Sequence, residues 1–305
     1  MKRACLIVWM IIAVLTVSFS AFAENAPWDC PDCGRTGNTG NFCGGCGHAA
    51  PGIGSSSESY GNDTVTAADN TEAVQAGDTV TLEELMLSAI AGDASAQYEL
   101  GWRYQNGIGT NQDYAEAMNW YQKAAAQGDA SAQFQIGKLY DNGWGVEQDY
   151  EEAFKWYMKA AEQGYAKAQN NIGVDYYLGE GVEQDYEEAL KWYMKAAEQG
   201  NAVAQNNIGE AYYYGEGVKQ NYEEAFKWYM KAAEQGNAGA QKNIGVCYVN
   251  GQGVGQNYEE AFKWYMKAAE QGNKTAISNV GYCYENGIGV EKDLEEAQRW
   301  YDKAK

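Results

Sequence analysis

Two cysteine pairs near the amino terminus have the spacing of metal ligands. Cys30 and Cys33 form one C-x-x-C-G knuckle, Cys43 and Cys46 form a second, and nine residues separate the two. Four thiolates provide the tetrahedral sulfur site that zinc prefers. The glycine after each knuckle allows a tight turn that points backbone N–H groups at sulfur. The spacing therefore predicts one structural zinc ion held by these four cysteines.

The residues around the knuckles resemble the short zinc-ribbon modules at the amino termini of many bacterial proteins. The matching stretches are W-x-C-P-x-C-G from Trp28 and F-C-x-x-C-G from Phe42, and both rings are expected to pack beside the metal. Two alternatives stay open, because an oxidising compartment favours disulfides and C-x-x-C motifs also perform redox chemistry. His48 is the single histidine. With four thiolates available, it is better explained as a solvated loop residue than as a substitute ligand.

The first 23 residues have the features of an export signal. Lys2 and Arg3 are followed by an apolar run over 4–17, and Ala21-Phe22-Ala23 is an A-x-A cleavage signature before Glu24. We expect cleavage there, a periplasmic or secreted protein, and no membrane insertion afterwards. The alternative is an uncleaved amino-terminal anchor, because 4–23 is about long enough to span a bilayer.

The charge balance restricts the class of partner. The chain has 42 acidic and 22 basic residues, which gives a net charge of −20. Such a protein repels phosphate backbones and anionic lipid headgroups, so nucleic acid and membrane surfaces are excluded as expected partners. The 24 tyrosines and 10 tryptophans suit thin two-layer structures and protein contact surfaces.

Composition divides the chain into four regions. The export signal, 1–23, precedes the cysteine module, 24–50. Residues 51–79 are rich in Ser, Gly, Thr, Asn and Asp, and they cannot bury enough apolar surface to offset the entropy of ordering. We predict a flexible linker over this stretch. Residues 80–305 are periodic.

The periodic region repeats every 36 residues. Glycines keep this step from Gly101 to Gly281 and tyrosines from Tyr104 to Tyr284; the tryptophans that keep it are Trp120, Trp156, Trp192, Trp228, Trp264 and Trp300. A fixed period of this length is typical of a solenoid, because each unit must stack on its neighbours to bury its apolar face. The sequence predicts six repeats.

Each repeat contains two helical patterns. In 164–199 a first helix is predicted over 166–178, and glycines at 179 and 181 end it. The second helix is predicted to begin at Asp185, a residue able to cap an amino terminus. Its expected buried stripe contains Ala189, Trp192, Tyr193 and Ala196.

These motifs resemble the Sel1-like repeat family, which is related to tetratricopeptide repeats. The resemblance rests on A-x-A-Q-x-x-I-G-x-x-Y, G-x-G-V and Y-E-E-A-x-K-W-Y-x-K-A-A-E-Q-G, which cover residues 92–305. It implies an all-α fold, a right-handed α-solenoid of antiparallel helix pairs. It also implies an adaptor or assembly scaffold. Exported bacterial members are often linked to envelope complexes, exopolysaccharide secretion or host contact.

The two ends of the array depart from the repeat pattern. The stretch 81–92 resembles an isolated second helix that caps the first repeat, with Leu82, Leu85, Ile90 and Ala91 expected to pack. The last repeat has Leu294 in place of tyrosine and a more polar second helix, as a terminal cap requires.

No catalytic set accompanies the repeats. The only histidine lies outside them, so neither a Ser-His-Asp nor a Cys-His arrangement is available there, and no phosphate loop is present. Glu-Glu pairs such as Glu187 and Glu188 recur in the repeats and are explained as first-turn helix charges. Cys247 and Cys283 share one repeat position; stacked helices lie about 8–10 Å apart, whereas disulfides usually need Cα atoms within about 7 Å. Two free, partly buried thiols are expected.

Positions that differ between repeats indicate where a partner binds. Their spacing of four and three places them on one face of each first helix, and that face lines the concave surface of helix-pair solenoids. Drift at unselected exposed positions would give the same variation. Aromatic residues, expected to be exposed at Trp102, Phe134, Tyr177, Tyr213 and Tyr282, favour binding. The candidate contact residues are Tyr98, Trp102, Gln105, Phe134, Lys138, Asp141, Asn170, Val174, Tyr177, Asn206, Glu210, Tyr213 and Tyr282.

Two functions are compatible with the sequence. The first is an exported scaffold whose protein partner belongs to the envelope or to a host. The second is an enzyme that acts on cell-wall material or β-lactams, as proposed for cysteine-rich Sel1 relatives. The lack of a nucleophile–base pair in the repeats favours the scaffold.

Overall fold

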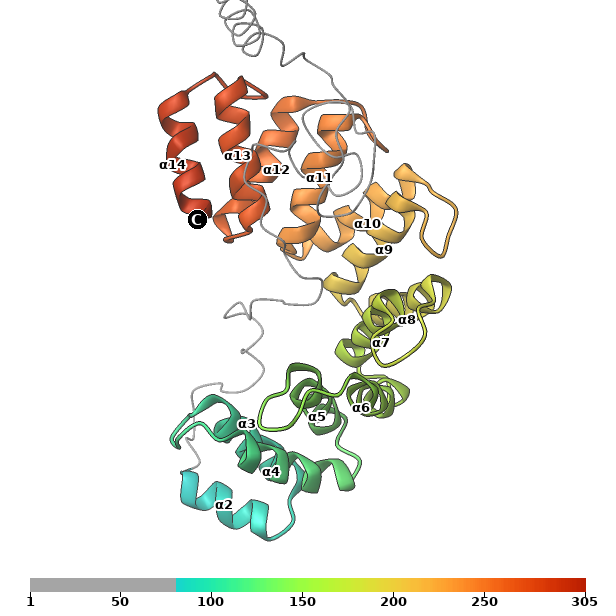
Figure 1. Ribbon diagram of the computed structural model, residues 1–305, viewed down its shortest axis with the longest axis vertical. Coiled ribbons are helices and arrows are strands. Elements are labelled where there is room, and N and C mark those ends of the chain that lie inside the picture. Colours follow the sequence, from blue (N-terminus) through green and yellow to red (C-terminus); the bar gives the residue numbers. More distant parts are fainter. Residues whose placement is uncertain (1–80) are drawn as a thin grey trace, which may run out of the picture. The chain divides into compact units, whose positions relative to one another are not determined.

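A computed structural model describes residues 81–305, and this part of the chain is built from helices and loops without a strand (Figure 1). The all-α fold expected from the repeats is confirmed. The helices are α2 (Leu82–Ile90), α3 (Ala94–Asn106), α4 (Tyr114–Ala126), α5 (Ala130–Asn142), α6 (Tyr150–Glu162), α7 (Ala166–Leu178), α8 (Tyr186–Glu198), α9 (Ala202–Tyr214), α10 (Tyr222–Glu234), α11 (Ala238–Asn250), α12 (Tyr258–Glu270), α13 (Lys274–Asn286) and α14 (Leu294–Ala304). The described residues fall into two compact units, 81–273 and 274–305.

In the first unit each helix packs against the next helix along the chain, from α2 through α12 (Figure 1). The second helix of a repeat therefore contacts its own first helix and the first helix of the following repeat. This continuous stacking of helix pairs is the α-solenoid that the 36-residue period predicts. None of the helices described is long and apolar enough to cross a membrane.

Local sequence signals place the helix ends where they were predicted. Helix α7 ends at Gly179, whose φ of +77° lies in the left-handed region that glycine adopts without steric cost. Helix α8 begins after Asp185, whose carboxylate accepts hydrogen bonds from the backbone N–H groups of Glu187 at 2.9 Å and Glu188 at 3.0 Å. These bonds satisfy amide donors that the first turn of a helix leaves free.

A glycine of the first helix packs directly on a tyrosine of the second helix. In the third repeat, a Cβ atom added to Gly173 would lie 2.5 Å from Cδ1 of the Tyr193 ring. Tyr193 is buried, whereas Trp192 is only half-buried, so the predicted burial of Trp192 in the core is wrong. Instead, the Nζ of Lys195 lies 3.4 Å from the centroid of the Trp192 ring. That cation–π contact suits a ring that keeps one face near water.

In each of the first five repeats a buried glutamine of the first helix forms hydrogen bonds that join neighbouring helices. Gln169 in α7 donates to the backbone carbonyl of Ala161 in α6 at 3.1 Å and accepts a hydrogen bond from Gln199, after α8, at 2.7 Å. One amide thus joins three successive helices. The glutamine pair recurs between Gln97 and Gln127, Gln133 and Gln163, Gln205 and Gln235, and Gln241 and Gln271. Fully satisfied buried networks of this kind fix the register of packed helices.

Helix α2 caps the first repeat with one face only. Thr81 and Glu84 form a reciprocal capping box at its amino terminus. Leu85 and Ala89, four residues apart, are the buried side chains. Ile90 is 68% exposed, and Ala91 is exposed as well, so the expectation that these two residues pack is wrong. The face that contains Leu85 and Ala89 points to α3, and Ile90 lies off that face.

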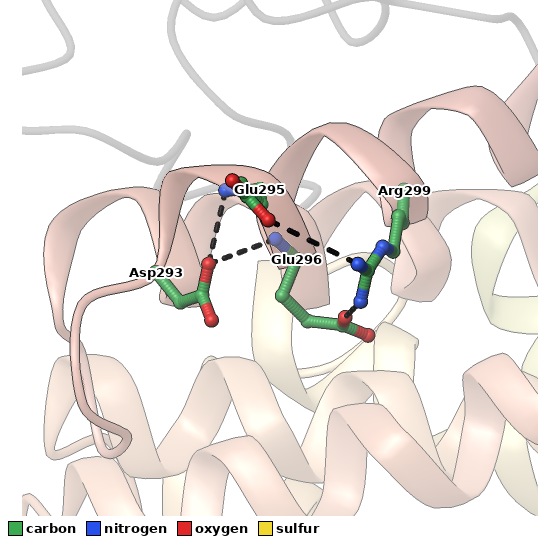
Figure 2. Close-up of polar contacts among 4 residues, drawn as sticks. All are labelled: Asp293, Glu295, Glu296 and Arg299. Carbon is green, nitrogen blue, oxygen red and sulfur yellow. Dashed lines mark hydrogen bonds and ion pairs between the residues drawn. The ribbon is translucent and has the colours of Figure 1, made fainter.

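The second unit is the helix pair α13 and α14, and α14 has a polar surface. Figure 2 shows the carboxylate of Asp293 accepting hydrogen bonds from the backbone N–H groups of Glu295 at 2.9 Å and Glu296 at 3.0 Å. Arg299 pairs with the Glu296 carboxylate at 2.8 Å on the same surface. Leu294 is 61% exposed. The polar character predicted for the final helix is therefore confirmed.

Cys247 in α11 and Cys283 in α13 are free thiols, as predicted. Both are fully buried rather than partly buried, with no exposed surface. Burial raises the pKa of each thiol to about 12, so both act as small apolar side chains.

Candidate protein-binding surface

The predicted contact residues lie in the first helices of the repeats. Twelve of them belong to α3, α5, α7 and α9, and we refer to these twelve as the first-helix surface. Tyr282 lies in α13, within the second unit. The members of the first-helix surface are Tyr98, Trp102, Gln105, Phe134, Lys138, Asp141, Asn170, Val174, Tyr177, Asn206, Glu210 and Tyr213.

The aromatic residues of this set are less exposed than the sequence suggests. Phe134 is 7% exposed, Tyr213 3% and Tyr282 4%, so the expectation that these three rings are exposed is wrong. Trp102 and Tyr177 are half-buried. The solvent-accessible part of the first-helix surface is thus formed by half-buried side chains, which are Tyr98, Trp102, Gln105, Lys138, Asp141, Val174, Tyr177 and Glu210.

The burial has a physical reason, because the first helices also contact the following repeat. Tyr98 and Trp102 of α3 pack against a core cluster formed by α4 and α5. Phe134 of α5 contacts the rings of Tyr157 and Tyr165, with centroids 5.6 and 5.2 Å away. Variation between repeats at these positions therefore reflects packing between repeats as well as any contact with a partner.

An amide network joins the first helices in the middle of the solenoid. Asn207 of α9 donates to the side-chain oxygen of Asn170 in α7 at 3.1 Å. Asn243 of α11 donates to Asn206 at 2.9 Å and to Glu210 at 3.0 Å. Asn170 and Asn206 are buried, 8% and 9% exposed. These two predicted contact residues stabilise the stacking of repeats.

The carboxyl-terminal ends of the first helices reach the glycine loop of the next repeat. Tyr177 donates a hydrogen bond to Glu216 at 3.0 Å, and Tyr213 bonds to Gln252 at the equivalent position. Asp141 accepts a hydrogen bond from Tyr157 at 3.1 Å. Burial raises the pKa of Asp141, opposed by that hydrogen bond and by the positive charge of Lys138.

Positive charge near the first-helix surface is limited in the amino-terminal repeats. Arg103 is paired with Glu99 of the same helix at 2.9 Å, and both side chains are largely buried. Lys138 is half-buried beside Phe134, with its Nζ 5.9 Å from the ring centroid. These cations offset only part of the acidic surface.

Asp175 of α7 is a buried acid that is not among the predicted contact residues. Its carboxylate is 7% exposed, and the equivalent residues in α5, α9 and α11 are the apolar Leu139, Ala211 and Cys247. Aligned on the 36-residue period, the same position in the other repeats holds Arg103, Leu139, Ala211, Cys247 and Cys283, so Asp175 is its one acid. The predicted contact positions, which are spaced four and three residues apart, do not include it.

The predicted zinc ligands, Cys30, Cys33, Cys43 and Cys46, lie outside the described residues, and so does the export signal. Within residues 81–305, no group of three or more His, Cys, Asp or Glu side chains is arranged to hold a metal ion.

Comparison with known proteins agrees with this geometry. The sequence model described as Sel1 repeat matches residues 94–129, 130–165, 166–201, 202–237, 238–273 and 275–305. A Sel1 repeat protein from Oxalobacter formigenes is 37% identical with a TM-score of 0.68, covering 74% of this chain and 88% of that one. The Escherichia coli protein c5321, a protective antigen of uropathogenic strains, is 42% identical with a TM-score of 0.67, covering 74% of this chain.

Two of these relatives are much longer than the matched part. The chain spans 48% of c5321. The secretory immunoglobulin A-binding protein EsiB of Escherichia coli O6:H1 is 47% identical over 45 residues, which are 15% of this chain and 9% of EsiB.

Proposed function

Because the chain belongs to the Sel1 repeat family, we propose that it is an exported, non-enzymatic scaffold that binds a protein partner on the concave side of its solenoid. Sel1 repeat proteins are generally protein-interaction scaffolds, and the helix pairs described above are of that kind. The names of two relatives, an antigen and an immunoglobulin-binding protein, support a partner outside the cytoplasm.

One observation carries the proposal. The recurrent side chains are explained by the architecture: the glycine–tyrosine contacts and the Lys–Trp pairs recur in all six repeats, and the buried glutamines in the first five. The half-buried members of the first-helix surface differ from repeat to repeat and keep part of their surface accessible. Large aromatic side chains such as Trp102, placed among polar neighbours, are the residues that dominate contact energies at protein interfaces.

We place the strongest contacts in the first two repeats. Tyr98 and Trp102 of α3 lie there together with Lys138 of α5. Because Phe134 is buried, we exclude it from the expected contact with the partner. It packs in a core cluster with Tyr157.

The experiment that tests this function is capture of partners from an envelope extract by the full chain and by two variants. Trp102→Ala removes the proposed anchor. Ile108→Ala removes an apolar side chain that is 44% exposed in the loop after the same helix. A protein retained by the wild type and by Ile108→Ala, but lost with Trp102→Ala, supports the proposal. Equal retention by all three would place binding elsewhere.

Export and zinc binding are separate parts of the proposal. Cleavage before Glu24 is tested by the intact mass of the exported protein; a mass that includes residues 1–23, in the membrane fraction, would establish an anchor. The four thiols of Cys30, Cys33, Cys43 and Cys46 form a donor set that suits zinc, and bound metal would hold that module folded.

A further inference from the structure

An Asn-Gly pair ends the first helix of four repeats. In each pair the asparagine is the last residue of the helix, and the glycine that follows has a φ between +67° and +70°. The sequence contains this dipeptide at no other place. The pairs are Asn106-Gly107, Asn142-Gly143, Asn250-Gly251 and Asn286-Gly287. Because the four copies share one backbone conformation, the environments of their side chains can be compared directly.

Three of the four asparagines are held by a hydrogen bond to their own helix. Asn106 donates its side-chain amide to the backbone carbonyl of Trp102 at 2.8 Å. Asn142 and Asn286 make the equivalent bond, to the carbonyl four residues before each, at 2.9 and 3.0 Å. Such a bond draws the side chain back along the preceding turn of the helix. It therefore keeps the side-chain carbon Cγ away from the nitrogen of the glycine that follows.

Asn250 of α11 lacks this bond. Its side chain is exposed and forms no hydrogen bond with the residues that the structure describes. The backbone is not the cause, because the N–H of Gly251 donates to the carbonyl of Cys247. The N–H of Gly107 donates to Arg103 in the same way. Helix ends fray, and when this one opens, nothing holds the Asn250 side chain away from the Gly251 nitrogen.

We propose that Asn250 is the site at which the solenoid deamidates spontaneously, through a cyclic imide formed with Gly251. The backbone nitrogen of Gly251, which no side chain shields, attacks Cγ of Asn250. The new N–Cγ bond replaces the Cγ–Nδ2 bond, and Nδ2 leaves as ammonia with the proton of the Gly251 nitrogen. Water then opens the ring: addition at Cγ gives aspartate, whereas addition at the main-chain carbonyl gives isoaspartate, in which the main chain runs through Cγ.

The loop that follows Asn250 packs closely on the preceding repeat. Tyr213 of α9 bonds through its hydroxyl to the side-chain oxygen of Gln252. A Cβ atom added to Gly253 would collide with the carbonyl oxygen of Tyr222. Isoaspartate lengthens the main chain by one carbon directly before this loop, and its negative charge lies at the negative end of the α11 dipole. Conversion of Asn250 therefore loosens the contact between the fourth and fifth repeats, whether or not the protein is a scaffold.

Incubation of the full chain at mildly alkaline pH tests the site. Samples taken over time are digested, and mass spectrometry measures the fraction of each of the four asparagines that has exchanged its amide for a carboxylate. We expect Asn250 to convert about fivefold faster than the other three, because one hydrogen bond changes the population of a conformation by about that factor. Equal or faster conversion at Asn106, Asn142 or Asn286 would overturn the proposal.

The same chain in urea is the matched control, because unfolding removes the side-chain bonds of all four asparagines. The four sites should then convert at similar rates. An equal lead of Asn250 in urea would attribute the order to neighbouring residues in the sequence and would also overturn the proposal.

Hydrogen exchange at the backbone amides of 252–257 tests the consequence. The isolated isoaspartate form should exchange faster there than the unmodified chain. Asn250→Gln, which does not readily close the five-membered ring, should keep its protection through the same incubation. Unchanged exchange in the isoaspartate form, or an equal loss of protection in Asn250→Gln, would refute the loosening of this loop.

Discussion

The contact between Gly209 and Tyr229 should not tolerate a single added methyl group. A Cβ atom at Gly209 of α9 would lie 2.5 Å from Cδ1 and Cε1 of the Tyr229 ring. Ordinary carbon contacts are about 3.5–4.0 Å, so the ring would have to move by about 1 Å. Tyr229 is 2% exposed and is enclosed by neighbours such as Ala225, which has no exposed surface. The ring therefore has little room to move.

Two opposing effects determine how much the Gly209→Ala substitution changes the free energy of unfolding. Replacing a glycine within a helix by alanine favours folding by about 1 kcal/mol. Overpacking a well-packed core typically costs about 1–3 kcal/mol. Because the added Cβ would lie too close to two atoms of the Tyr229 ring, we expect a cost at the upper end of this range. We expect a net loss of about 2 kcal/mol of unfolding free energy.

Urea unfolding followed by far-ultraviolet circular dichroism measures this loss. Gly255→Ala is the matched control, because a Cβ at this loop glycine meets nothing within 4 Å and its φ lies outside the left-handed region; its stability should change by less than about 0.5 kcal/mol. The reasoning is refuted if Gly209→Ala is as stable as the wild type while the control behaves as expected.

Three further changes have defined outcomes. Asp175→Asn should stabilise the fold. Because burial raises the pKa of folded Asp175 well above its ordinary value, the unfolded chain loses its proton first, and the stability of the wild type falls as the pH rises above about 4. In urea titrations the gain of the variant should therefore grow with pH from that point, towards about 1–3 kcal/mol, and a gain independent of pH would contradict this. Tyr193→Ala, which empties a buried site, should cost about 3–5 kcal/mol, while Trp192→Ala should cost clearly less in the same assay; the reverse order would contradict the observed burial. Cys33→Ser should release zinc in metal analysis and leave the thermal transition of the helices unchanged, whereas absence of both zinc and free thiols in the wild type would indicate disulfides.

The sequence predicts the repeat architecture well because its signals are local. The glycine at 179 can adopt a left-handed φ, Asp185 can accept amide hydrogen bonds, and the apolar spacing over 166–178 fits one helix. Each of these signals acts within a few residues of the position that it fixes, and repetition at 36 residues confirms each one several times. The helix bounds in the third repeat follow directly.

The burial of individual side chains depends on contacts between repeats, which local signals do not specify. The spacing of Phe134, Asn170 and Tyr213 places them on one face of their helices, but it does not indicate that the following repeat covers part of that face. For the same reason Trp192, whose position holds a tryptophan in every repeat, is half-buried, whereas the adjacent Tyr193 is buried in the core. The spacing of the variable positions does not include Asp175, and its burial and unpartnered Oδ2 atom are visible only in the structure.

The affinity of the captured partner for the full chain tests the scaffold proposal most directly. Isothermal titration calorimetry on the wild type, Trp102→Ala and Ile108→Ala compares an anchor of the first-helix surface with an exposed loop residue of the same repeat. We predict that Trp102→Ala weakens binding by about 2 kcal/mol, about thirtyfold, with its helical content retained, and that Ile108→Ala binds as the wild type does. Unchanged affinity in a Trp102→Ala, Lys138→Ala double variant would contradict binding at the first-helix surface.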